Sequence, residues 1–116
     1  MDNIINETKN GKVFICKSCK KIHVEFNNLN FNFTKEEFYH FSRYISQVNG
    51  EYWEKVNTDS TYRRKILIPL DHKNLNLLLN KEELEEMKIL LKSAPLKQKQ
   101  MKLLAYSMIN FQTFYN

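Results

Sequence analysis

The chain of 116 residues is long enough for one domain with a single hydrophobic core, and 42% of its residues are hydrophobic. It contains no run of 18 apolar residues, so we expect no transmembrane helix. Its first residues, MDNIINETKNGK, lack the basic and apolar segments of a signal peptide. We therefore expect a cytoplasmic protein in which Cys16 and Cys19 form no disulfide.

The net charge of +5 raises the question of an anionic partner. The excess is mostly lysine scattered among asparagine and glutamate, and no recognisable nucleic-acid-binding motif accompanies it, so we expect no nucleic-acid partner. Phosphate binding is one possible role of the run Tyr62, Arg63, Arg64 and Lys65. A solvated entrance to a strand is the more common role of such a run.

The first part of the chain is predicted to contain three strands after a flexible lead-in over residues 1–11. The runs 12–16, 21–26 and 29–33 are β-prone, and the last two alternate apolar and polar residues. The asparagines at 27–28 form the expected turn between them, because asparagine tolerates positive φ. These runs predict an antiparallel sheet with one apolar face.

A first helix is predicted after Thr34, which with Glu37 matches a capping box. It is expected to end at Gly50, a residue suited to a left-handed C-terminal cap, and residues 51–61 are expected to be a linker. Its apolar stripe consists of Phe38, Phe41, Ile45 and Val48.

The second half of the chain predicts the same plan. Strands are expected over 64–70 and 75–79, followed by a second helix that Asn80 and Glu83 cap. Its apolar stripe consists of Leu84, Met87, Leu90, Leu91 and Ala94.

A short repeat relates the two halves, because LNFNFTKEEF at Leu29–Phe38 is followed later by LNLLLNKEEL at Leu75–Leu84. We expect two ββα-like units, about 12–49 and 62–94, in an α+β domain over residues 12–96. Their helices are expected to cover one side of an antiparallel sheet in a two-layer arrangement. Phe33 and Leu79 are expected to occupy equivalent buried sites.

The C-terminal segment 97–116 is predicted to hold a third helix that is more apolar than an exposed helix should be. We expect it to cover the sheet, to bind a protein partner or to mediate self-association as a homodimer. Its apolar positions at helical spacing are Met101, Leu104, Ala105, Met108 and Ile109.

The stretch CKSCKKIHVEFNNLNFNFTKEEFYHF resembles a family of small uncharacterised bacterial proteins, a domain of unknown function. Its members carry a two-cysteine hairpin, a strand pair with the pattern V-x-F-x-N/G-x, and a helix that opens with an acidic pair before phenylalanine. The resemblance spans Cys16–Ala94 and implies a single domain. It implies no activity, ligand or catalytic residue.

A metal site is the sharpest functional hypothesis. A CxxC pair at a hairpin tip, Cys16 and Cys19, has the knuckle geometry that binds zinc, and His23 on the return strand offers a third ligand. A zinc ribbon needs a second cysteine pair, which the chain lacks, so the fourth ligand stays open among His72, His40, an acidic side chain, water or a partner subunit. The alternative is a metal-free hairpin in which His23 lies on a solvated face.

The sequence predicts no enzyme, because it contains none of the common nucleophile, phosphate-loop, dinucleotide or zinc-protease motifs. A thioredoxin-like role for Cys16 and Cys19 is disfavoured, because that chemistry uses a helix N-terminus and these cysteines lie between β-prone runs. The acidic pairs 36–37 and 82–83 fit helix first turns better than catalysis. We expect a non-catalytic interaction or structural module, with zinc binding as the alternative.

Overall fold

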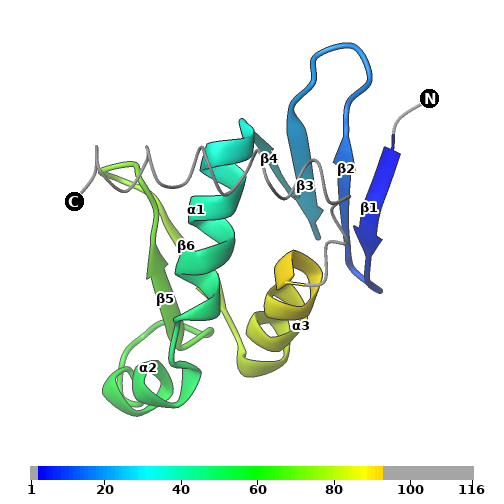
Figure 1. The fold of residues 1–116 in the computed structure, drawn as a ribbon. Coiled ribbons are helices and arrows are strands. Elements are labelled where there is room, and N and C mark those ends of the chain that lie inside the picture. The colour runs from blue at the N-terminus through cyan, green and yellow to red at the C-terminus, as the bar shows by residue number, and fades with distance from the viewer. Residues whose placement is uncertain (1–2, 93–116) are drawn as a thin grey trace.

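The computed structural model describes residues 3–92, which fold into an α+β arrangement of antiparallel strands and helices (Figure 1). This confirms the predicted fold class. In chain order the elements are β1 Asn3–Glu7, β2 Gly11–Ile15, β3 Ile22–Phe26, β4 Leu29–Phe33, α1 Lys35–Ser46, α2 Gly50–Val56, β5 Ile66–Pro69, β6 Asn76–Leu79 and α3 Lys81–Lys92.

Strands β1 to β4 form one antiparallel sheet in sequence order. The β3–β4 hairpin turns at the predicted asparagine pair, with Phe26 opposite Leu29 and Asn27 at a φ of 52°. Alternation sets the two faces of the sheet, since Ile22, Val24 and Phe26 are buried while the residues between them are not.

Strand β1 corrects the expectation of a flexible lead-in over residues 1–11. It pairs with β2 at the sheet edge, and the Asn6 side chain donates a hydrogen bond of 2.9 Å to the backbone oxygen of Leu90 in α3. In the following turn, the Glu86 carboxylate accepts from the Thr8 hydroxyl at 2.7 Å and from the Asn10 amide at 2.8 Å. These polar bonds to α3 anchor the segment together with the pairing to β2 and the packing of Ile5 against the core.

Strands β5 and β6 form a separate two-stranded antiparallel sheet, which differs from the single sheet expected from the sequence. The two sheets lie on either side of α1 in Figure 1. Helix α3 packs against α1 and contacts strands of both sheets, so the helices join the sheets into one body.

Both long helices begin with the predicted capping boxes. In α1, the Thr34 hydroxyl accepts from the Glu37 amide at 3.2 Å and the Glu37 carboxylate accepts from the Thr34 amide at 2.8 Å. In α3, Asn80 and Glu83 exchange the same pair of bonds at 2.8 and 2.9 Å. Each box satisfies backbone donors that the helix itself leaves unpaired.

The predicted helix end at Gly50 is wrong. Helix α1 ends at Ser46, and no glycine of the described residues has a positive φ. Gly50 opens α2, whose remaining residues fall within the expected linker over 51–61. Asn49 caps α2 by accepting from the Tyr52 amide at 3.1 Å. Gly50 serves close packing instead, because a Cβ there would lie 3.0 Å from a methyl carbon of Leu84.

One hydrophobic core joins the sheets and helices, and no polar side chain is buried in the described part of the chain. Leu79 is 3% exposed, whereas Phe33 is half-buried against Phe31 and Phe41, so the expected equivalence of Phe33 and Leu79 fails in burial. The buried residues are Val13, Ile22, Val24, Phe26, Phe38, Phe41, Ile45, Ile66, Ile68, Leu77, Leu79, Leu84, Met87, Leu90 and Leu91.

Among residues 3–92, no helix has the length and apolarity needed to cross a membrane. Ala94 and the C-terminal helix predicted within 97–116 lie outside the described residues. The partner role expected for that segment therefore stays a prediction.

Candidate metal centre

The candidate site lies at the tip of the β2–β3 hairpin, which extends beyond the neighbouring strand ends in Figure 1. The turn is closed by two backbone hydrogen bonds of 3.0 Å, from the Cys16 amide to the Lys21 carbonyl and from the Lys20 amide to the Cys16 carbonyl. Lys20 has a φ of 59°, which reverses the chain after Cys19. The cysteine pair thus occupies the tight turn that the sequence predicts.

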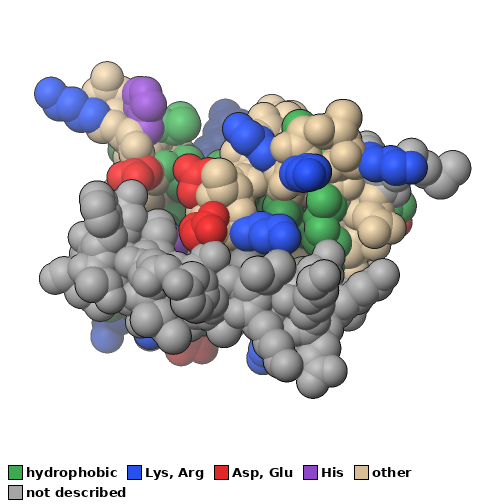
Figure 2. All heavy atoms as spheres, turned by 45° about the horizontal axis from the view of Figure 1, so that its top comes forward, with side chains coloured by type: hydrophobic (Ala, Val, Ile, Leu, Met, Phe, Trp, Pro, Cys, Tyr) green, Lys and Arg blue, Asp and Glu red, His purple; other side chains and the backbone are tan. Residues whose placement is uncertain are grey.

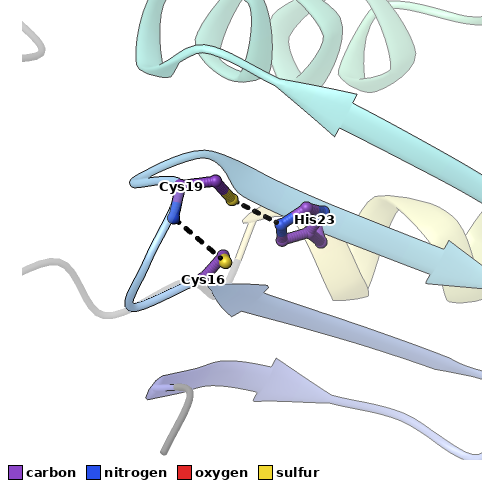
Figure 3. A group of neighbouring side chains, drawn as sticks. All are labelled: Cys16, Cys19 and His23. Atoms are coloured by element: carbon purple, nitrogen blue, oxygen red, sulfur yellow. Dashed lines mark hydrogen bonds between the residues drawn. The ribbon is translucent and has the colours of Figure 1, made fainter.

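Three predicted ligands converge at this tip, since the ligand atoms of Cys16, Cys19 and His23 all lie within 4.8 Å of one another (Figure 3). The Cys19 amide donates to Cys16 Sγ at 3.3 Å, and Cys19 Sγ lies 3.3 Å from His23 Nε2. Cys19 is exposed, while Cys16 and His23 are half-buried. All three ligands therefore come from one short stretch of chain, the turn and the start of β3.

The outer face of the sheet holds the His23 ring from two sides. Cross-strand pairing places Phe14 and Asn32 opposite His23 on the neighbouring strands. The Phe14 ring stacks on the imidazole with centroids 5.0 Å apart, and His23 Nδ1 hydrogen-bonds to Asn32 Oδ1. Because an amide oxygen only accepts, Nδ1 carries the proton and Nε2 presents its lone pair to Cys19.

The electrostatics of the turn favour a thiolate at Cys16. Hydrogen bonds within the turn, from the side chain of Cys19 first and then from the hydroxyl of Ser18 and the backbone of Cys19, lower the pKa of the Cys16 thiol from 9.0 to about 6. The thiolate is the form of cysteine that binds metals and attacks electrophiles.

The donor set and spacing fit zinc. Two sulfurs and one imidazole nitrogen are standard zinc ligands, and bonds of about 2.3 and 2.0 Å in a tetrahedron separate sulfur from nitrogen by roughly 3.5 Å. The observed separation of 3.3 Å between Cys19 Sγ and His23 Nε2 is close to that value. The bond from Nδ1 to Asn32 is the outer contact that orients metal-bound histidines.

The other histidines do not join the group. Among the described residues, the ligand cluster consists of Cys16, Cys19 and His23, while His40 belongs to α1 and His72 to the β5–β6 connection. Asn32 and Phe14 were not among the predicted site residues. The register of the two hairpins is the signal that identifies them, because the turn at 27–28 sets position 32 opposite His23.

The remaining sequence candidates have structural roles. Arg64 forms a two-pronged bond with Glu83, at 2.7 and 3.1 Å, and the Lys65 ammonium donates to the Ser60 carbonyl at 2.7 Å. Two of the three cations that could have bound phosphate in the run 62–65, Arg64 and Lys65, are therefore bonded to protein groups instead. The acidic residues Glu37 and Glu83 are occupied in the capping boxes, as predicted.

The CxxC turn also lacks the arrangement of a thioredoxin-like redox site. It lies between β2 and β3, so no helix begins at either cysteine. A helix N-terminus is a main source of the lowered nucleophile pKa in that class of protein. Here the hydrogen bonds within the turn lower the pKa of Cys16 instead.

Comparison with known proteins gives one match, to a family model described as a family of unknown function (DUF6686), which covers residues 1–116. It confirms the resemblance to an uncharacterised family and extends it beyond Cys16–Ala94 to both ends of the chain. No curated protein and no solved structure matches the chain.

Proposed function

Because this chain belongs to a family of unknown function (DUF6686), we propose its role from its own site: a non-catalytic, zinc-binding structural module of the cytosol. One observation carries the proposal, namely that Cys16, Cys19 and His23 bring their ligand atoms within 4.8 Å of one another. The cytosol suits this role because it keeps paired thiols reduced and ready to bind metal.

Zinc would displace protons from the thiols of the turn. With Nδ1 of His23 protonated toward Asn32, the lone pair of Nε2 faces Cys19 Sγ across 3.3 Å. In the zinc-bound form, His23 Nε2 and the thiolates of Cys16 and Cys19 would hold the ion, and the thiol protons would be released to solvent. Sulfur and imidazole ligands favour zinc over the hard, oxygen-binding cations magnesium and calcium.

The metal would make the hairpin tip rigid. In the described structure, two backbone bonds close the turn and its residues 17–21 are exposed, so little apolar burial holds it. Three metal bonds fix the turn to β3 and hold the outer face of the sheet as a defined surface. Such a surface would suit the binding of a partner.

Metal content tests the proposal directly. Protein purified without chelator should contain close to one zinc per chain by elemental analysis, and Cys19→Ser should lose it because two ligands do not hold zinc tightly. His72→Ala is the matched control, since His72 is exposed on the other hairpin and its loss should leave the zinc content unchanged. Metal-free wild-type protein would refute the proposal.

Chelation provides the second measurement. Removing zinc should lower the melting temperature, because metal binding to the folded state stabilises it, and adding zinc back should restore the original value. The double variant Cys16→Ser/Cys19→Ser should melt like the stripped protein, with or without zinc. A melting curve that chelator leaves unchanged in zinc-loaded protein would contradict a structural role.

A further inference from the structure

We propose that the zinc centre keeps its fourth coordination position open to solvent and binds a small monodentate anion there. This inference rests on the proposed zinc site and adds a ligand to it. Three features of the chain support it: the number of ligands, the direction from which they come, and the charge around them.

The ligand count leaves one position of a tetrahedral centre empty. In the described part of the chain, only Cys16, Cys19 and His23 gather as metal-binding side chains. Outside it, the sequence offers one residue of these types, Asp2, and residues 93–116 contain no Cys, His, Asp or Glu. Zinc sites with four protein ligands are closed, whereas sites with three protein ligands keep a position for water or an added ligand.

The direction of the ligands points the open position outward. All three come from the β2–β3 hairpin, and the dashed contacts in Figure 3 run across one end of it. A tetrahedral ion held by three ligands on its protein side presents its fourth position on the opposite side. Cys19 is exposed, so that side opens to solvent rather than to the core.

The charge around the centre favours an anion. Zinc with two thiolates and a neutral imidazole has no net charge, while Lys17, Lys20 and Lys21 are exposed in the same turn. The nearest acidic residue on this face of β3 is Glu25, which lies opposite Lys12 on the neighbouring strand. Figure 2 shows Lys and Arg side chains in the centre and right of the view and again at the far left beside a histidine, with the Asp and Glu side chains between them.

The test uses full-length protein loaded with cobalt(II), which adopts the zinc geometry and absorbs visible light. Azide should change the cobalt spectrum and saturate with one azide per cobalt, and the neutral ligand imidazole should do so too. The double variant Lys17→Gln/Lys21→Gln should weaken azide binding by roughly twofold per lysine at low salt. It should leave imidazole binding unchanged, which separates the charge effect from damage to the site.

The outcomes separate the two proposals. If the protein gives no cobalt–thiolate absorption, the zinc site itself is wrong. If that absorption appears but neither azide nor imidazole alters it, the open position is wrong. Two further measurements then identify the fourth ligand. If the cobalt spectrum of Asp2→Asn responds to azide or imidazole, the fourth ligand is Asp2. If the spectrum responds only after dilution, and light scattering shows that the mass falls, the fourth ligand comes from a second copy of the chain. Azide binding that the lysine variant leaves unchanged would refute the role of charge.

Discussion

The two hairpin–helix units of this protein, β3–β4–α1 and β5–β6–α3, have the same pairing on their core faces and different residues on their outer faces. In the first, Ile22 pairs with Phe33; in the second, Ile66 pairs with Leu79. A second apolar pair follows in each hairpin, and each unit continues into a helix with a capping box. Whether the units superpose as a structural repeat stays a prediction.

On the outer face, the pair between these two apolar pairs is His23 with Asn32 in the first hairpin and Leu67 with Leu78 in the second. The core-facing residues determine that a hairpin packs, whereas the outward pair is free to vary. In the first unit, the outward pair orients the His23 imidazole next to the cysteine turn. The comparison teaches that a hairpin of this kind packs against its helix without a polar outer pair, because the second hairpin has Leu67 and Leu78 at these positions.

The largest expected effect is on the core of the second unit. Leu79→Ala should lower the free energy of unfolding by about 2–5 kcal/mol, because Leu79 is 3% exposed and its truncation leaves a cavity. Phe33→Ala should cost less, because Phe33 is half-buried and relaxes toward solvent. Urea unfolding of both variants measures the difference. An equal or larger loss for Phe33→Ala would mean that the first unit holds the more important core.

The second effect concerns the outer pair. Asn32→Leu, which copies the residue at Leu78, should lower zinc affinity by roughly 10–100-fold, because His23 loses the acceptor that orients it. Asn30→Leu is the matched control, since Asn30 lies on the same strand face opposite Glu25 and touches no ligand. Competition with a chromophoric chelator measures the affinity. Equal affinities in the two variants would show that Asn32 does not position the imidazole.

The third effect is shared by both units. Thr34→Ala and Asn80→Ala should each lower the free energy of unfolding by about 1 kcal/mol, because each removes the side-chain acceptor of a capping box. Neither should change zinc content, since neither Thr34 nor Asn80 belongs to the ligand group Cys16, Cys19 and His23. Urea unfolding and elemental analysis of the same samples test both statements. Zinc loss in Thr34→Ala would show that the scaffold and the site are coupled.

Much of this fold follows from local sequence. The strands and helices that alternate or cap strongly, from Ile22 to Ser46 and from Ile66 to Lys92, lie close to their predicted positions. Strand β1 was missed because NIINE does not alternate apolar and polar residues, and it is held by β2 and by α3, which is distant in sequence. Helix α2 was missed because an Asn-Gly pair fits the end of one helix as well as the start of the next.

The division into two sheets was not predictable, because strand pairing between distant segments leaves no local pattern. The site was easier, because Cys16, Cys19 and His23 belong to one hairpin and the hairpin was identified correctly. Its supporting residues Phe14 and Asn32 are neutral and common, so only the register across three strands reveals them. Whether a metal is bound depends on the protonation of the ligands and on their affinity for the metal, and the sequence pattern reveals neither.

The smallest expected effect distinguishes the two capping boxes by charge. The Arg64 hydrogen bonds lower the pKa of the Glu83 carboxyl below its usual 4.5, and partial burial opposes this shift. A lowered pKa means that the stabilisation is present above about pH 4.5 and is lost as the pH falls below that value. Because the Arg64 side chain is 51% exposed, solvent screens its attraction to Glu83, and the contribution should be a few tenths of a kcal/mol.

Glu83→Gln removes the charge while glutamine keeps the capping contact, so it isolates this contribution. The variant should be slightly less stable than wild type at pH 7, and the difference should disappear near pH 3. Glu37→Gln is the matched change in the first unit, where the capping carboxylate accepts from Thr34. Urea unfolding at both pH values compares the two variants. If Glu37→Gln shows the same pH-dependent loss as Glu83→Gln, the arginine contact does not distinguish the two caps.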